Sequence, residues 1–184
     1  MVHVDKSHSS LKYVQYAATE LQSALATWTA DIPIVSPSFA KNNGRNFLAV
    51  GYGAAAALTK GDNLGDEGYT IKSTTSGVAI TGDEGAPRGT IYGTYAFLRE
   101  LGFEWFAADE FFAPPTSSCP DTLPDFDVIF VPAYEYRDNN QFQLSNNEDF
   151  AVRIGNNRGD FDAVHGGTVK YAEPPGELLA SRKA

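Results

Sequence analysis

Cysteine is nearly absent from this chain of 184 residues, and that shortage narrows the classes of protein to consider. The single cysteine, Cys119, excludes an internal disulfide framework and a cysteine-rich zinc site. Its place beside Pro120 in a predicted loop offers nothing that would activate a nucleophile, so we expect an incidental thiol. The histidines His3, His8 and His165 are scattered along the sequence, and we expect no metal site and no cofactor.

Basic residues are also scarce relative to acidic ones. The chain has 14 Lys and Arg against 23 Asp and Glu, which gives a formal net charge of −9. We expect no nucleic-acid partner, because such a partner needs a basic surface that follows the phosphates. No run of eighteen apolar residues occurs, so we expect no membrane-spanning segment and no membrane partner. The start, Met1–Lys6, lacks the basic and apolar regions of a secretory signal.

The acidic charge that is present lies mostly in the second half of the chain. Residues 1–92 carry 8 acids and 7 bases, a net of −1, whereas residues 93–184 carry 15 acids and 7 bases, a net of −8. Between Glu104 and Asp149 there are ten acids and one base, Arg137. Such a segment is typical of a solvated acidic face, and the alternative is that it faces a pocket.

The pattern of apolar residues predicts an alternation of strands and helices. Apolar residues recur at three- and four-residue steps from Leu11 to Trp28, which predicts a long helix with Ser9 or Ser10 as its cap. A second helix is predicted from about Thr90 to Leu101. The remaining predicted elements are a β-hairpin at residues 69–72 and 78–81, the end of a short strand within residues 1–6, strands at 32–35, 47–50, 103–107, 127–131 and 134–137, and helices at 54–58 and 145–154. This order favours an α+β fold with a mostly antiparallel, mixed sheet and two helices packed on one face.

Two glycines share one face of the second predicted helix. Gly89 and Gly93 are four residues apart, so the helix is expected to approach a sheet closely where it lacks side chains. On the strand that follows, Trp105 and Phe106 are predicted to be core residues. The alternative for these two aromatic side chains is stacking on a sugar ring.

The many acidic and aromatic residues raise the question of glycoside hydrolysis. That chemistry needs two carboxyl groups about 5–5.5 Å apart for retention, or about 6.5–9.5 Å apart for inversion. Glu135 and Asp138 are three residues apart on a predicted strand, so their side chains are expected on opposite faces. The neighbouring pairs Asp109-Glu110 and Glu148-Asp149 point apart in the same way. We therefore expect no catalytic residue in this chain.

One block of the sequence resembles a known family. Residues 90–106, TIYGTYAFLRELGFEWF, preceded by Pro87-Arg88-Gly89, are similar to the second-helix signature in the N-terminal domain of α-glucuronidases and β-hexosaminidase-like glycoside hydrolases. Weaker similarity at Tyr16–Gln22, Ile32–Val35 and Gly65–Ile71 extends the resemblance over residues 2–138. The resemblance implies a non-catalytic layer of mostly antiparallel sheet and two helices that packs on a (β/α)8 barrel.

The chain beyond residue 130 resembles the start of the barrel in the subgroup that carries an uncharacterised glucuronidase-like barrel. Pro132–Asp138 is similar to the first barrel strand, Phe150–Arg158 to the first barrel helix, and His165-Gly166-Gly167 to the segment that follows. Residues 1–130 are therefore expected to form the accessory domain. Residues 131–184 are expected to form a truncated first βα unit of the barrel, poorly ordered towards its C-terminal end, with the catalytic acid and base of later strands absent.

The resemblance also implies candidate residues for substrate binding. Active sites of such barrels lie at the C-terminal ends of the strands. Arg137 would lie there, where a guanidinium can hold sugar hydroxyls or a uronate carboxylate. Asp138 and His165 are further candidates, and a structural role is the alternative for all three residues.

The sequence and the resemblance together predict a role in carbohydrate metabolism. The chain would be the non-catalytic N-terminal domain of a glycoside hydrolase acting on uronic-acid or amino-sugar glycosides, and inactive alone. Its packing partner would be its own catalytic barrel, and carbohydrate would be the ligand of the full-length enzyme. The resemblance implies secretion, whereas the sequence shows no secretory signal, so we expect either a cytoplasmic protein or a sequence whose N-terminus is incomplete, and the localisation stays unknown. The alternatives are a stand-alone carbohydrate-binding or interaction module without hydrolytic activity, and a degraded gene remnant.

Overall fold

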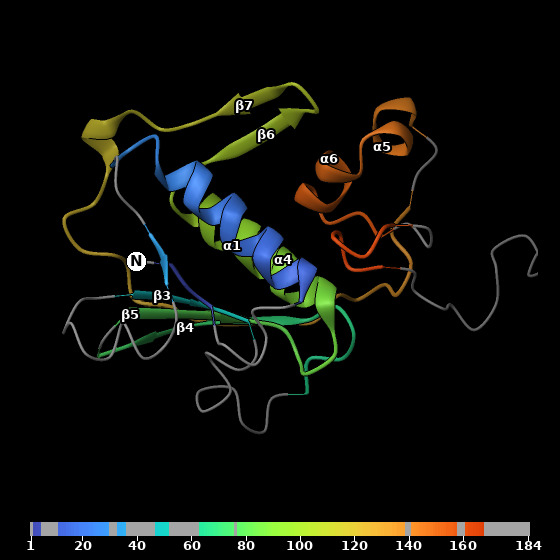
Figure 1. Cartoon of the computed structure of the whole chain (residues 1–184), viewed down its shortest axis with the longest axis horizontal. Coiled ribbons are helices and arrows are strands. Elements are labelled where there is room, and N and C mark those ends of the chain that lie inside the picture. Colours follow the sequence, from blue (N-terminus) through green and yellow to red (C-terminus); the bar gives the residue numbers. More distant parts are fainter. Residues whose placement is uncertain are drawn as a thin grey trace, which may run out of the picture.

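A six-stranded sheet with two helices on one face forms the centre of the molecule (Figure 1). In this computed structural model the described residues are 2–4, 11–29, 33–35, 47–51, 63–75, 77–138, 141–157 and 161–167. The strands of the sheet are β1 (Val2–Val4), β2 (Ile34–Val35), β3 (Phe47–Val50), β4 (Tyr69–Thr74), β5 (Gly77–Thr81) and β8 (Asp127–Phe130). The helices are α1 (Lys12–Leu25) and α4 (Pro87–Glu100). The predicted α+β class and the two helices on one face are confirmed.

The sheet is mixed, with the strand order β2–β1–β3–β5–β4–β8. β1 runs parallel to both β2 and β3, and β3 runs parallel to β5. Strand β4 runs antiparallel to β5 and to β8. The predicted hairpin is confirmed as β4–β5, but the prediction that most pairing is antiparallel is wrong. A helix crosses over between β1 and β2, and such a connection returns the chain in its original direction.

The core lies between the sheet and the two helices. Helix α1 buries the apolar stripe that the sequence predicts, and alternate residues of β3 and β5 face it. The buried side chains of this layer include Val14, Leu21, Leu48, Val50, Val78, Ile80, Ile91, Tyr95 and Leu98. Each of the two helices has 14 residues, and no helix among the described residues is long and apolar enough to cross a membrane.

Helix α4 approaches the sheet closely, as the spacing of its glycines predicts. A Cβ atom at Gly89 would lie 2.1 Å from the carbonyl oxygen of Gly68, a distance that atoms do not adopt. A Cβ atom at Gly93 would lie 3.0 Å from the Cβ of Tyr69. The missing side chains therefore let α4 pack against β4 and the turn before it.

A second layer covers the helices on the side away from the sheet (Figure 1). It contains the hairpin β6 (Glu104–Ala107) and β7 (Glu110–Phe112), which leads into the short 3-10 helix η1 (Thr116–Ser118). Trp105 of β6 is buried and meets the ring of Tyr95 edge-on at 5.1 Å. Phe106 is exposed, so the prediction of a core position is correct for Trp105 and wrong for Phe106. Successive side chains of a strand point to opposite faces.

The segment after β8 differs from the predicted start of a barrel. Residues 131–138 form neither strand nor helix, so the predicted strand at 134–137 is wrong. The predicted helix at 145–154 is divided into α5 (Phe142–Asn146) and α6 (Glu148–Arg153). The division falls at Asn147, whose side chain caps α6 by accepting a hydrogen bond from the Phe150 amide at 2.8 Å.

The short helices α5 and α6 pack on the same core as α1 and α4. Leu144, Phe150, Val152 and Phe161 are buried within that core. The expected division at residue 130 therefore does not coincide with an edge of the hydrophobic core, and it stays a prediction. The expected cap at Ser9 or Ser10 is wrong, because α1 begins at Lys12 and its N-cap is Leu11, which has no side chain that accepts a hydrogen bond. The expected helix at 54–58 and the chain beyond residue 167 lie outside the described residues.

Candidate functional site

Arg137 lies in the loop after β8, and every nitrogen of its guanidinium is engaged. Its Nη2 pairs with Oε2 of Glu67 at 2.7 Å. Its Nε and Nη1 donate to the carbonyl oxygens of Gly155 at 2.9 Å and Tyr134 at 2.8 Å. The guanidinium also stands over the ring of Tyr92, 5.5 Å from its centre. These contacts fix Arg137 against the body of the protein.

Glu67 is the centre of a buried polar network. Its Oε1 accepts a hydrogen bond from Arg88 Nη1 at 3.3 Å, and its Oε2 accepts one from Asn157 Nδ2 at 2.7 Å. Arg88 also donates to the carbonyl oxygens of Asn157 and Gly167. Burying charges is costly unless they are paired and hydrogen-bonded, and here both conditions hold. The network ties the turn before β4 and the start of α4 to residues 137–167.

Asp138 follows Arg137 in sequence, but its carboxylate has a different partner. The hydroxyl of Tyr136 donates to Oδ2 of Asp138 at 2.9 Å. The other oxygen, Oδ1, is buried, and none of the described residues donates a hydrogen bond to it. Asp138 therefore lies beside the network of Glu67 without an ion pair to it.

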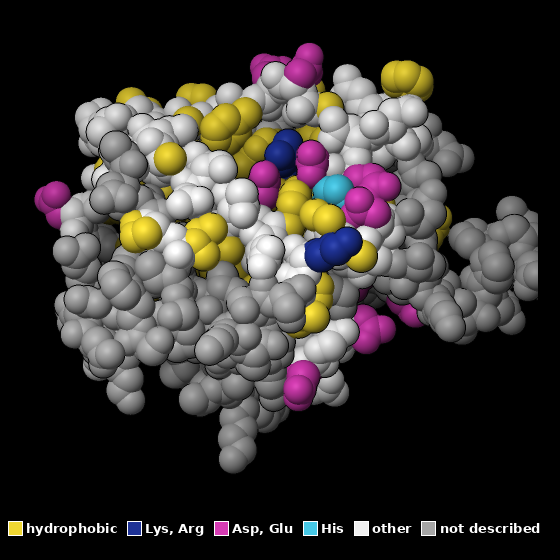
Figure 2. All heavy atoms as spheres, in the orientation of Figure 1, with side chains coloured by type: hydrophobic (Ala, Val, Ile, Leu, Met, Phe, Trp, Pro, Cys, Tyr) yellow, Lys and Arg dark blue, Asp and Glu magenta, His cyan; other side chains and the backbone are white. Residues whose placement is uncertain are grey.

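His165 lies in a second cluster, which packs against α1 and α6. Its Nε2 is 2.8 Å from Oδ1 of Asp149, and its Nδ1 is 2.9 Å from both Oδ1 of Asp162 and Oε2 of Glu148. The hydroxyl of Tyr16 donates to the same Asp149 oxygen at 2.8 Å. On the face shown in Figure 2, acidic side chains lie against one side of a histidine side chain and hydrophobic side chains lie against the other.

The charges in this second cluster change the protonation of its members. Burial disfavours a charged imidazole, but the hydrogen bond to Asp149 and the charges of three carboxylates raise the pKa of His165 above its ordinary value. Burial acts against the charged form of Asp149 as well. The hydrogen bonds from His165 and Tyr16, with the charge of Arg153, hold the pKa of Asp149 below its usual value.

The three candidate substrate-binding residues thus occupy two clusters. Arg137 and Asp138 lie together, whereas His165 belongs to the cluster of α1 and α6, and a role in substrate binding stays a prediction for all three. The two clusters are linked through the backbone, since Arg88 donates to the carbonyl of Gly167. Sequence reasoning did not select Glu67, because its partners are 21 to 90 residues away and no local pattern marks it.

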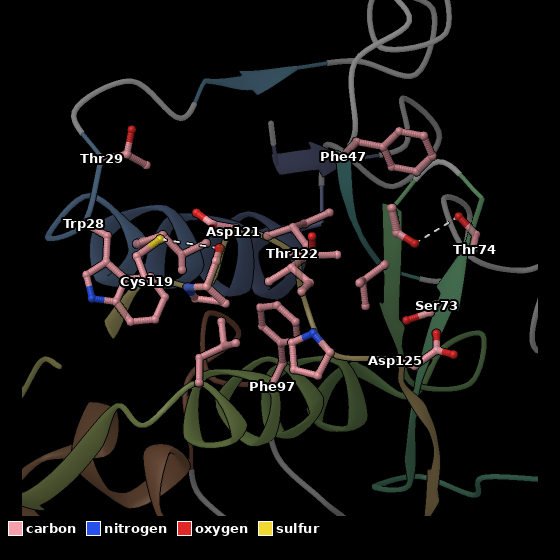
Figure 3. Close-up of a pocket in the computed structure, with 18 of the residues that line it drawn as sticks. Trp28, Thr29, Phe47, Ser73, Thr74, Phe97, Cys119, Asp121, Thr122 and Asp125 are labelled. Atoms are coloured by element: carbon pink, nitrogen blue, oxygen red, sulfur yellow. Dashed lines mark hydrogen bonds between the residues drawn. The ribbon is translucent and has the colours of Figure 1, made fainter. Parts of the chain in front are cut away.

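A groove of about 640 Å³ lies at the C-terminal ends of α1 and α4 (Figure 3). Its walls come from the end of α1, from β3 to β5 and from the loop 119–125. Aromatic side chains, several hydroxyl groups and two carboxylates line it, namely Trp28, Phe47 and Phe97, Ser73, Thr74 and Thr122, and Asp121 and Asp125. Among the described residues that line the groove there is no Lys, Arg or His. The hydroxyl, carboxylate and aromatic side chains of the groove suit a ligand that carries both hydroxyl groups and an apolar face.

No family model matches the chain, and no curated protein matches it. A solved structure with similarity to it is that of a GH138 enzyme targeting pectin rhamnogalacturonan II. The two are 15% identical in sequence, with a TM-score of 0.43 over 74% of this chain. The chain spans 12% of the length of that structure.

Proposed function

We propose that this chain is the non-catalytic N-terminal domain of a glycoside hydrolase and that it packs against the catalytic domain. The observation that carries the proposal is the number of large apolar side chains at its surface. Twelve are exposed among the described residues, and all but Ile34 lie between residues 106 and 154. The others are Phe106, Phe111, Phe112, Leu123, Ile129, Phe130, Val131, Tyr134, Tyr136, Phe142 and Ile154. Large apolar side chains exposed on a folded domain are typical of surface that another domain covers where they adjoin one another, as Phe111 and Phe112 do on β7 and Ile129 and Phe130 do on β8.

The buried network of Glu67 gives the proposal further support. It fixes the chain that leaves β8 against the start of α4, through Arg137 and Asn157. The described part of this segment is held by ion pairs and hydrogen bonds, whereas a flexible interdomain linker is exposed and makes few contacts. Such a segment is compatible with a domain that packs closely on its neighbour.

The experiment that tests the proposal combines the coding sequence with two assays. We expect the reading frame to continue beyond Ala184 into a (β/α)8 barrel that carries two acids at its strand ends. Purified 1–184 should hydrolyse no aryl glycoside of glucuronic acid or of an N-acetylhexosamine. The separately produced barrel should bind 1–184 and reduce its binding of an apolar fluorescent dye. Hydrolysis by 1–184, or a barrel that leaves dye binding unchanged, would overturn the proposal.

The groove at the ends of α1 and α4 favours a second candidate, a stand-alone carbohydrate-binding module. Trp28 and Phe47 offer aromatic surface for a sugar ring, and Asp121 and Asp125 offer acceptors for its hydroxyl groups. We expect a saturable change in tryptophan fluorescence on titration with neutral oligosaccharides. Asp125→Asn should weaken that change, whereas Glu110→Gln on β7, outside the groove, should leave it intact. No response to neutral, acidic or amino-sugar glycans would exclude this candidate.

A further inference from the structure

Three donor atoms from two segments of the chain converge beside α6. Nδ1 of His165 lies 2.9 Å from Oε2 of Glu148 and 2.9 Å from Oδ1 of Asp162. All three atoms lie within 4.8 Å of one another. A zinc ion about 2.0–2.2 Å from each ligand requires ligand atoms about 3–3.5 Å apart, so little movement is needed to reach that spacing. One imidazole nitrogen and two carboxylate oxygens are ordinary ligands of zinc.

Backbone amides donate hydrogen bonds to both carboxylate oxygens but do not neutralise their charge: the amides of Val164 and His165 donate to Oδ1 of Asp162, and the amide of Asp162 donates to Oε2 of Glu148. A ring nitrogen carries at most one hydrogen, yet Nδ1 of His165 faces two carboxylate oxygens at equal distance. The other nitrogen, Nε2, faces a third carboxylate, that of Asp149, at 2.8 Å. Three carboxylates around one imidazole leave net negative charge even when the ring is protonated. Arg153 pairs with Glu20 at 2.9 Å and its charge also acts on Asp149, which leaves Glu148 and Asp162 as the carboxylates whose charge a divalent cation at Nδ1 would balance.

The far side of the imidazole is held as it is in metal-ligating histidines. Such a histidine usually donates the hydrogen of its other ring nitrogen to a carboxylate, which fixes the tautomer and the ring orientation. Asp149 provides that carboxylate at Nε2, and the hydroxyl of Tyr16 in turn holds Asp149 at 2.8 Å. With Nε2 carrying the hydrogen, the lone pair of Nδ1 points between Glu148 and Asp162. Asp149 and Tyr16, which are not among the three proposed ligands, therefore orient the imidazole of His165.

We propose that Glu148, Asp162 and His165 bind one zinc ion, that water completes its coordination, and that Asp149 is a positioning residue. The ion would join the turn at residues 161–167 to the first turn of α6, so its role is structural. Zinc is expected in preference to calcium or magnesium, because those ions favour oxygen ligands alone. The sequence does not reveal the site, since the site has one histidine and its two carboxylates lie 3 and 17 residues away.

Isothermal titration calorimetry of the full chain, treated with a chelator and then titrated with zinc chloride, tests the proposal. The chain carries His3→Ala and His8→Ala, so that His165 is the one remaining histidine. We expect one zinc ion per chain, and a Kd at least about tenfold weaker in Glu148→Gln, Asp162→Asn and His165→Ala. Circular dichroism checks that each variant is folded. Asp162 is exposed, so Asp162→Asn remains informative if His165→Ala unfolds.

The controls separate this site from general attraction between zinc and an acidic protein. Glu110→Gln removes an exposed carboxylate on β7 and should leave the Kd unchanged. Asp149→Asn should weaken zinc binding by about tenfold, as loss of an outer hydrogen-bond partner does in known sites. Calcium in tenfold excess should not displace zinc. Absence of zinc binding, displacement by calcium, or equal affinity in Glu148→Gln, Asp162→Asn and Glu110→Gln would overturn the proposal.

Discussion

Replacing Glu67 with glutamine tests whether the buried polar network holds the chain after β8 against the sheet and helices. The change keeps the shape of the side chain and removes the negative charge between Arg88 and Arg137. The side chains of Glu67 and Arg88 are 9% and 1% exposed, so one guanidinium loses its counter-charge in a buried site. Removal of one partner from a buried pair costs about 3–5 kcal/mol. Arg137 is 24% exposed, and its charge is partly solvated, which places the cost near the lower end, at about 3 kcal/mol.

Urea unfolding followed by circular dichroism measures this cost as a change in the free energy of unfolding. In a thermal experiment, about 3 kcal/mol corresponds to a fall in Tm of about 6–12 °C for a chain of this size. The matched control is Glu104→Gln, which makes the same change in an exposed pair with Arg99. The side chain of Glu104 is 44% exposed and that of Arg99 is 33% exposed, and Oε2 of Glu104 lies 3.6 Å from Nε of Arg99. Such a pair contributes less than about 1 kcal/mol.

The comparison between the two glutamine variants decides the question. If Glu67→Gln costs no more than Glu104→Gln, the network does not hold the structure together and the reasoning is refuted. Hydrogen exchange adds the location of the effect. We expect the amides of Ala151 and Asn156 to exchange faster in Glu67→Gln, because Asn157 loses its charged partner.

Three further predictions concern the core and one titrating group. Burial, with the charges of Tyr16 and Glu20, raises the pKa of Tyr95, so its contribution to stability is complete below about pH 10 and is lost as the pH rises further. Urea midpoints from pH 8 to 11 should fall above pH 10, and less steeply in Tyr95→Phe; an equal slope would contradict this. Gly89→Ala places a Cβ 2.1 Å from a carbonyl oxygen and should cost at least about 2 kcal/mol; an unchanged Tm would contradict it. Phe161→Ala should lower the free energy of unfolding by about 3–5 kcal/mol in the same urea assay, because the side chain of Phe161 is 3% exposed. Its control is Phe142→Ala, which should cost under about 0.5 kcal/mol, because the side chain of Phe142 is 81% exposed. A small cost for Phe161→Ala would place it outside the core.

The elements that sequence predicted correctly are those with a strong local pattern. Helix α1 has an apolar stripe of helical period, and the hairpin β4–β5 has alternating residues on both sides of a turn. The local sequence pattern does not predict the parallel pairing of β3 with β5, because the residues of Phe47–Val50 do not indicate which strand lies beside them. Element type follows from neighbours in sequence, whereas pairing follows from the whole chain.

The segment at 134–137 shows why a local pattern can mislead. Its aromatic and charged residues alternate as in a half-buried strand. In the structure the side chain of Asn157 takes the place of a partner strand. Its Nδ2 donates to the carbonyl oxygen of Glu135, and its Oδ1 accepts from the amide of Arg137 at 2.6 Å. The side chain of Asn157 thus forms the hydrogen bonds to the backbone of Glu135 and Arg137 that a neighbouring strand would have formed, and these residues do not form a strand.

The candidate sites depend on contacts that are long in sequence. Arg137 was selected from the resemblance, but its partner Glu67 is 70 residues away. The surroundings of His165 include Tyr16, near the other end of the chain. Such clusters require the packing of α1, α6 and the turn at 161–167 to be known first, which spacing along the sequence does not provide.

Strand β8 ends the sheet and has one neighbour, β4, among the described strands. The backbone edge of β8 that faces away from β4 has no partner among the described strands, and the side chains of Ile129 and Phe130 on its two faces are exposed, a combination that promotes association of strands between molecules. The residues that oppose such aggregation are Asp127, a charge at the start of the strand, and Pro132, which cannot donate to a growing ladder. Preparations of the isolated chain should therefore lose solubility at high concentration if either residue is replaced by valine. These two gatekeeper positions limit how freely β8 can be engineered.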